Sequence, residues 1–245
     1  MIVVVGDPTL RFAGGGIPAL AGGSAAALAR ACVRAGATVQ LAGKVGDDPA
    51  GDEILLALTR DGIGHVALLR DAGATTRLDE TSAPTVTEPS PNGDLPRDEW
   101  AVAEDDDSAG AVDPPDPAAE GGARHTSPES TLAPEDLDLA LRYLSTFAVL
   151  IVAQPLGPAT LAVAVESAAY AGAHLILIDV PDAATAAVAS VPVDDITALE
   201  SPPTDPDGVF TALVGRYAAA LDGGTPAAAA FRAALGAAGW EAATL

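Results

Sequence analysis

Apolar runs alternate with amphipathic segments along much of the chain, and this alternation predicts a parallel α/β fold. Residues 2–6 and 147–153 are short runs of Val, Ile, Leu and Ala, as expected for strands buried on both faces of a sheet. Residues 64–70 and 174–179 form two more such runs, and each follows a predicted helix after a short connection. Strands and helices that alternate in this way favour a mostly parallel central sheet.

Capping signals mark several helix boundaries. Residues 22–63 have the pattern of helix, strand, turn and second helix; Ser24 is predicted to cap the first helix and Gly36 to end it. Asp48 is predicted to cap the second helix, with Pro49 at its first position. Further helices are predicted over 134–144, 158–171, 208–221 and 226–239.

The composition changes in the middle of the chain. Residues 79–138 hold seventeen of the thirty-four acidic residues, with only Arg97 and Arg124 as basic residues and many prolines. No helical or strand periodicity is visible there, which is typical of a solvated segment. We therefore expect residues 1–245 to form a single domain in which 79–131 is an acidic, proline-rich lid or insertion region.

The charge and the apolar pattern of the chain indicate which partners and which cellular compartment to expect. The net charge is −22 and Lys44 is the only lysine, so we expect no nucleic acid and no anionic membrane as a partner. The longest apolar runs are too short to span a membrane, and residues 1–7 do not resemble a secretion signal. One cysteine, Cys32, allows no intrachain disulfide. These features predict a cytoplasmic protein.

Common catalytic and cofactor motifs are absent from the sequence. The three histidines are far apart and no Cys/His cluster has zinc-ligand spacing, so no metal site is expected. Neither G-x-S-x-G nor G-x-G-x-x-G after a strand is present. The residues by themselves indicate no certain cofactor.

Residues 22–62 nevertheless carry a specific resemblance. Gly22-Gly23 before an Ala-rich helix, followed by GKVGDDPAGDEILLAL, resembles the N-terminal signature of the ribokinase (PfkB) family of carbohydrate kinases. The resemblance implies a ribokinase-like three-layer α/β/α sandwich with a small or reduced β lid. It also implies a sugar or nucleoside substrate, with ATP and Mg as cofactors if the chain is a kinase.

The resemblance places substrate-binding groups at the lid and at the strand ends. Gly22 and Gly23 would let the backbone approach the substrate. Two polar residues that the family uses to bind sugar are replaced here, an Asp by Arg11 and an Asn by Ala27. Loss of one polar partner costs about 1–3 kcal/mol.

Two further residues follow predicted strands, where open α/β sheets place ligands. Asp7 comes directly after the first strand, and Gln154 after the run that ends at Ala153. Both are candidates for substrate binding. Asp7 has a second interpretation, as a turn or helix-end cap. Asp179, at the end of a later strand, is either a ligand or a helix cap.

The catalytic part of the family pattern is altered. The resemblance assigns magnesium and phosphate to Glu200, and it places Gly208 where the catalytic Asp should stand at the start of a helix. Asp207 lies one residue earlier, as a displaced base or as the helix N-cap. Pro206 supplies no backbone N–H, so the glycine-rich anion hole of the family is expected to be lost.

These substitutions favour a degenerate member of the family. The first hypothesis is a ribokinase-like protein that has lost ordinary phosphotransfer and binds a small molecule or another protein. One alternative is a divergent ATP-dependent sugar or nucleoside kinase with Asp207 as base. Another is a non-catalytic homodimeric assembly protein that pairs through its lid edge or apolar helices.

Overall fold

The structure of this chain is a computed structural model that describes residues 1–11, 20–79, 129–144, 146–180 and 196–237. These residues belong to one compact unit. The glycine triplet at 14–16 and most of the predicted acidic lid or insertion region, residues 80–128, lie outside the described residues. The elements in chain order are β1 Ile2–Val5, β2 Thr9–Arg11, β3 Leu20–Gly22, α1 Gly23–Arg34, β4 Val39–Gly46, α2 Pro49–Arg60, β5 Gly64–Asp71, α3 Pro134–Arg142, β6 Val149–Val152, α4 Pro158–Ala171, β7 His174–Ile178, β8 Ile196–Leu199, α6 Val209–Asp222 and α7 Ala227–Ala237.

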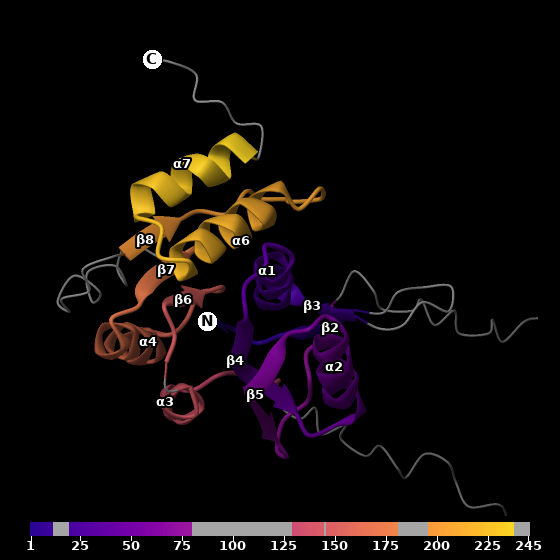
Figure 1. Cartoon of the computed structure of the whole chain (residues 1–245). Coiled ribbons are helices and arrows are strands. Elements are labelled where there is room, and N and C mark those ends of the chain that lie inside the picture. The colour runs from indigo at the N-terminus through magenta and orange to yellow at the C-terminus, as the bar shows by residue number, and fades with distance from the viewer. Residues whose placement is uncertain (12–19, 80–128, 145, 181–195, 238–245) are drawn as a thin grey trace, which may run out of the picture. The chain divides into compact units, whose positions relative to one another are not determined.

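The main sheet has six parallel strands in the order β5-β4-β1-β6-β7-β8 (Figure 1). Strand β1 lies inside the sheet, and all four of its residues are fully buried. This explains the continuous apolar run at the start of the chain, because both faces of the strand are covered. The predicted mostly parallel α/β fold is confirmed.

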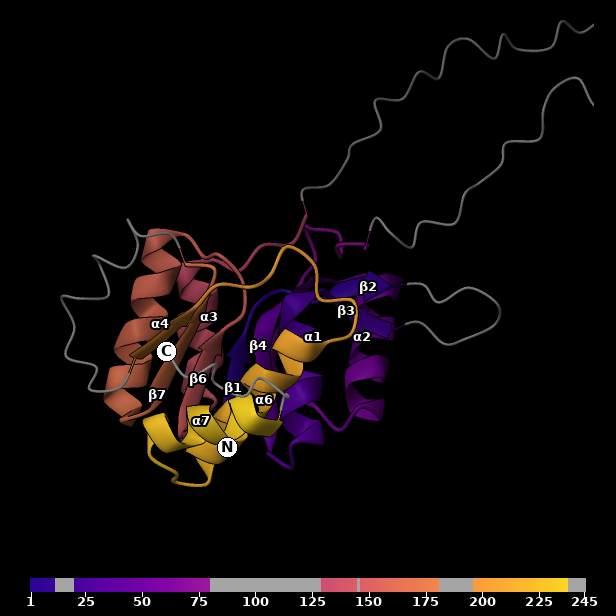
Figure 2. The same ribbon diagram turned by 90° about the horizontal axis from the view of Figure 1, so that it is seen from above.

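Helices cover both faces of the sheet and form two apolar cores. Ile2 and Val4 of β1 pack into the core that includes α1, α2, α6 and α7. Val3 and Val5 point to the other face, into the core that includes α3 and α4. The alternation of successive strand residues between the two cores gives the three-layer α/β/α arrangement expected from the resemblance (Figures 1 and 2).

A second, smaller sheet corresponds to the expected reduced β lid. Strands β2 and β3 pair antiparallel, with Leu10 opposite Ala21, and Leu78 adds a bridge to Leu10. The chain then runs from Gly22 directly into α1.

Several local boundaries differ from the sequence predictions. Helix α1 starts at Gly23 with Gly22 as its N-cap, so the prediction that Ser24 caps it is wrong. Strand β4 continues into the predicted turn as far as Gly46, because residues 43–46 continue to pair with β5. By contrast, Asp48 caps α2 through a 2.8 Å hydrogen bond from the Gly51 amide, as predicted.

Candidate functional site

The carboxyl ends of the parallel strands meet at one edge of the sheet, and the polar groups expected from the sequence gather there. They form three structures: a hydrogen-bond network around Asp7, a pocket below the small sheet, and the start of α6. The predicted site residues other than Glu200 belong to these three structures.

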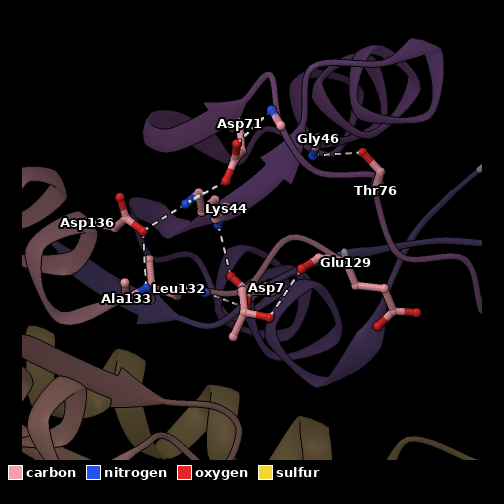
Figure 3. A network of polar contacts seen from close by, with 11 residues as sticks. Asp7, Lys44, Gly46, Asp71, Thr76, Glu129, Leu132, Ala133 and Asp136 are labelled. Atoms are coloured by element: carbon pink, nitrogen blue, oxygen red, sulfur yellow. Dashed lines mark hydrogen bonds and ion pairs between the residues drawn. The ribbon is translucent and has the colours of Figure 1, made fainter. Parts of the chain in front are cut away.

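Asp7 is the centre of the first structure, a buried polar network (Figure 3). Its side chain accepts hydrogen bonds from the Lys44 amide at 2.9 Å and the Leu132 amide at 3.2 Å. Gln154 completes the set: its Nε2 donates to Asp7 at 3.4 Å, and its Oε1 accepts from the Asp7 amide at 3.1 Å. Asp7 is only 4% exposed, and this burial raises its pKa despite the hydrogen bonds.

Asp7 and Gln154 have a structural role in this network. They hold together segments that follow β1 and β6, strand β4 and the chain before α3. The interpretation of Asp7 as a turn or helix-end cap is wrong, because its partners lie far away in the sequence. Neither side chain lines the pocket described below.

Lys44 extends this network to α3. Its ammonium group lies 2.8 Å from Asp71 and 3.0 Å from Asp136, and its side chain is 16% exposed. Asp136 also accepts a 3.1 Å hydrogen bond from the Ala133 amide at the start of α3. Hydrogen bonding to the two carboxylates, Asp71 first, raises the pKa of Lys44, and the same contact lowers the pKa of Asp71. The single lysine therefore joins β4, β5 and α3.

A pocket of about 390 Å³ forms the second structure, between the small sheet and the ends of β7 and β8. Its walls come from β3, the first turns of α1, the end of β7, the loop after β8 and the start of α6. The lining residues include Arg11, Gly22, Gly23, Ala27, Asp179, Ser201 and Asp205.

The pocket brings together four positions at which the resemblance places substrate-binding groups. Gly22 and Gly23 line it. So do Arg11 and Ala27, which replace the polar sugar-binding residues of the family. The sequence register of the resemblance therefore agrees with the geometry, although two of the side chains have changed.

Asp179 occupies an unusual conformation at the end of β7. It has a positive φ of 54°, which few residues other than glycine adopt. Its carboxylate accepts hydrogen bonds from the Ser201 amide at 2.7 Å and the Ser201 hydroxyl at 2.5 Å. These bonds fix the loop after β8 against β7. Strained residues of this kind are concentrated at functional sites.

The start of α6 is the third structure, and Asp205 dominates it. Its carboxylate accepts hydrogen bonds from the Phe210 amide at 3.1 Å, the Thr211 amide at 3.0 Å and the Thr211 hydroxyl at 2.7 Å. The Val209 amide contributes as well. Partial burial works against ionisation of Asp205, but these hydrogen bonds outweigh it and lower the pKa.

The prediction that Asp207 caps this helix is therefore wrong, because Asp205 provides the cap from two residues earlier. Asp207 is exposed and lies outside the lining of the 390 Å³ pocket. Gly208 precedes α6 with a φ of +66°, in the left-handed region that glycine tolerates. Sequence analysis missed Asp205 because a side chain that reaches five or six residues ahead departs from the usual N-cap spacing.

Glu200 lies outside the lining of the 390 Å³ pocket. It is exposed directly after β8 and, together with Asp205 and Asp207, lines a neighbouring hollow of about 570 Å³ between the loop after β8, α6 and α7. Thr197, three residues earlier, replaces the Asn of the family. Its hydroxyl lies 2.8 Å from both His174 Nε2 and the Tyr217 hydroxyl, in a contact between β7, β8 and α6.

Two further observations concern metals and membranes. Across the described ranges, no three His, Cys, Asp or Glu side chains are grouped so that they could hold a metal ion. Within the same ranges, none of the helices combines the length and the apolar character needed to cross a membrane.

Comparison with solved structures defines the class of fold. The tetrameric inhibited form of phosphofructokinase-2 from Escherichia coli superposes with a TM-score of 0.57 at 12% identity, covering 97% of this chain and 92% of that one. The same enzyme in complex with fructose-6-phosphate gives a TM-score of 0.56 at 12% identity, with the same coverage. An uncharacterized sugar kinase from Pyrococcus horikoshii matches with a TM-score of 0.43 at 12% identity; the match covers 73% of this chain and 55% of that chain. The fold is that of the ribokinase-like α/β proteins.

A sequence match covers the N-terminal part of the chain. Residues 14–83 match the family model described as pfkB family carbohydrate kinase. No curated protein matches the chain. Residues 14–83 are thus similar to the pfkB family carbohydrate kinases, and the chain has the ribokinase-like fold.

Proposed function

We propose that this PfkB-family chain has lost ordinary phosphate transfer to a sugar and retains a role in binding a small molecule. The binding site is the 390 Å³ pocket between the small sheet and the ends of β7 and β8. A sugar or a nucleoside is the ligand class that the family membership suggests.

One observation carries this proposal: the start of α6 is already occupied by a carboxylate of the chain itself. The amides of residues 209–211 donate to Asp205, while the Ala212 amide donates to the Gly208 carbonyl at 2.8 Å. Phosphate groups bind at helix starts through free amides of this kind. Here an incoming phosphate would have to displace Asp205 and would meet its negative charge.

The side chains around the pocket support the same conclusion. Arg11 forms a 2.9 Å ion pair with Asp79, and Ala27 offers only a methyl group. Phosphoryl transfer depends on precise positioning and on stabilisation of developing charge. The start of α6 offers little of either, because Asp205 occupies amides there and Asp207 lies outside the lining of the pocket.

Isothermal titration calorimetry is the direct test. The protein should bind a member of a panel of sugars and nucleosides, and ATP with Mg²⁺ should give no phosphorylated product in the same mixture. Turnover of ATP together with the bound sugar or nucleoside would contradict the proposal.

Asp205→Ala tests the observation on which the proposal depends. Removal of the carboxylate should free the amides of α6 and increase the affinity for inorganic phosphate at least about tenfold, since hydrogen bonds to a charged group contribute about 1.5–3 kcal/mol. Asp207→Ala is the matched control, because it removes the same charge two residues away without freeing these amides. Equal gains in both variants would show that general charge repulsion, rather than occupied amides, limits phosphate binding.

Asp207 is the reason to keep the kinase alternative. It is an exposed carboxylate one residue before Gly208, and it could act as a displaced base. If the chain is a divergent sugar or nucleoside kinase, the wild type phosphorylates a substrate and Asp207→Asn abolishes this activity. Chromatographic detection of ADP and phosphorylated product distinguishes the two functions.

A further inference from the structure

Helices α3 and α4 lie side by side on one face of the sheet (Figures 1 and 2). A groove of about 860 Å³ runs between them. Its apolar lining includes the half-buried Val163 and three residues of the core beneath it, Leu141, Leu144 and Phe147, which are 6–8% exposed. The groove lies over the core that faces away from α1 and α6, so it is separate from the proposed ligand pocket.

The exposed aromatic residues of the described chain are concentrated on this pair of helices. Tyr170, near the end of α4, lines the groove with 97% of its surface exposed. Tyr143, directly after α3, is 63% exposed. The other four described aromatic side chains are buried or half-buried. Tyrosine is enriched in protein interfaces, because it offers a large apolar area and a hydroxyl group at low entropic cost.

Acidic residues border the groove. Glu135 and Glu166 are exposed at its edge. Asp138 is also there, in a 2.6 Å ion pair with Arg142 of the same helix. This internal pair neutralises the only basic residue in the lining, so the border keeps a negative charge.

The negative charge of this border favours one kind of binding partner for the groove over another. A second copy of this chain would bring another acidic border and a net charge of −22, which disfavours pairing across the groove. A cationic segment would instead be attracted to Glu135 and Glu166. The groove between the two helices, with the exposed Tyr170 at its edge, suits a third helix with one apolar face.

We propose that the groove between α3 and α4 docks a cationic amphipathic helix of a partner protein. The apolar face of that helix packs against Val163 and Tyr170, and its Lys or Arg residues face Glu135 and Glu166. This inference is independent of the ligand pocket and of any remaining kinase activity.

The probe is a fluorescein-labelled amphipathic peptide of about 18 residues, or roughly five helical turns, built from Leu and Lys. Two related peptides serve as comparisons: one with Glu in place of Lys, and one with the Leu and Lys order scrambled to remove the apolar face. Fluorescence anisotropy with the full chain should show binding of the first peptide only. Comparable binding of the scrambled cationic peptide would overturn the proposal, since attraction by net charge alone would then suffice.

Matched variants locate the site. Tyr170→Ala and Glu166→Gln in the groove should each weaken binding at least about fivefold, as expected for interface residues. Leu56→Ala and Glu53→Gln on the exposed surface of α2 remove similar groups from the opposite face and should change binding less than about twofold. Equal losses in the two sets would place the peptide elsewhere.

Sedimentation equilibrium provides the last check. The wild type should remain free of dimers that involve the groove. A dimer that Tyr170→Ala disrupts would instead identify a second copy of the chain as the occupant and would overturn the proposal.

Discussion

Individual carboxylates determine which backbone amides at this edge of the sheet are available to a ligand. Asp7, a candidate ligand from its position after β1, is committed to backbone amides of Lys44 and Leu132. Asp205 is committed in the same way to the amides of α6. Both residues satisfy donors that would otherwise be available to a ligand or left without partners.

Asp205→Ala should destabilise the protein by about 1–2 kcal/mol at pH 7, as loss of a helix cap does. The folded protein lowers the pKa of Asp205, so its contribution is complete above the unfolded pKa of about 3.9 and is lost as the pH falls through the lower folded value. The difference from wild type should therefore shrink in acid. Urea unfolding at neutral and acidic pH measures it.

Asp207→Ala is the control for this measurement. Its exposed side chain should contribute less than about 0.5 kcal/mol at either pH. A difference between wild type and Asp205→Ala that stays constant from neutral pH to strong acid would contradict the assignment of the carboxylate as the cap.

At the scale of elements, the close packing of helices α1 and α6 depends on a single residue. Gly215 of α6 faces Ala31 of α1, and a Cβ atom at Gly215 would lie 2.6 Å from the Ala31 carbonyl carbon. The two helices approach each other so closely only because this residue has no side chain. No comparable crowding exists at Gly236 of α7, where a Cβ would meet open space.

Gly215→Ala should destabilise the protein by about 1–3 kcal/mol, because overpacking outweighs the gain in helix propensity of up to about 1 kcal/mol. Gly236→Ala should have the opposite sign and stabilise slightly. Thermal and urea unfolding of both variants measure the contrast. Stabilisation in both would show that α1 and α6 can separate without cost.

Lys44 holds β4, β5 and α3 through two carboxylates. Lys44→Met should cost about 1–3 kcal/mol, since it leaves Asp71 and Asp136 close together without their cation in a partly buried site. Arg142→Met removes a cation from an exposed pair with Asp138 on α3 and should cost less than about 0.5 kcal/mol. Urea unfolding compares the two, and equal losses would argue against a special role for Lys44.

The sequence predicted elements with strong local signals and missed those that depend on distant partners. The Asp48 cap and the bounds of the helix over 158–171 follow from neighbouring residues, and both are confirmed. Ser24 fails as a cap because the close contact of Gly22 with the small sheet brings the helix start forward. The network of Asp7 joins Leu132 and Gln154, more than a hundred residues away, and no local pattern encodes it.

At the scale of the whole molecule, the net charge of −22 is the dominant physical property. Self-repulsion of this size opposes the compact state and is screened by salt. The urea midpoint should therefore rise between about 10 mM and about 0.5 M NaCl, where the Debye length falls from about 30 Å to only a few ångströms. Urea is the right denaturant because it adds no ions. A midpoint that falls with salt would mean that favourable ion pairs outweigh the repulsion.

One feature near the small sheet bears on how such a chain can change length over evolution. Thr75 and Glu129 form a backbone bridge, the Ser130 amide donates to the Thr75 carbonyl at 3.0 Å, and Arg77 pairs with Glu129 at 3.1 Å. The described residues on either side of 80–128 therefore lie next to each other. Closing a loop costs only about 0.6 kcal/mol more for each doubling of its length. Relatives could therefore gain or lose dozens of residues at this junction while the rest of the architecture stays undisturbed.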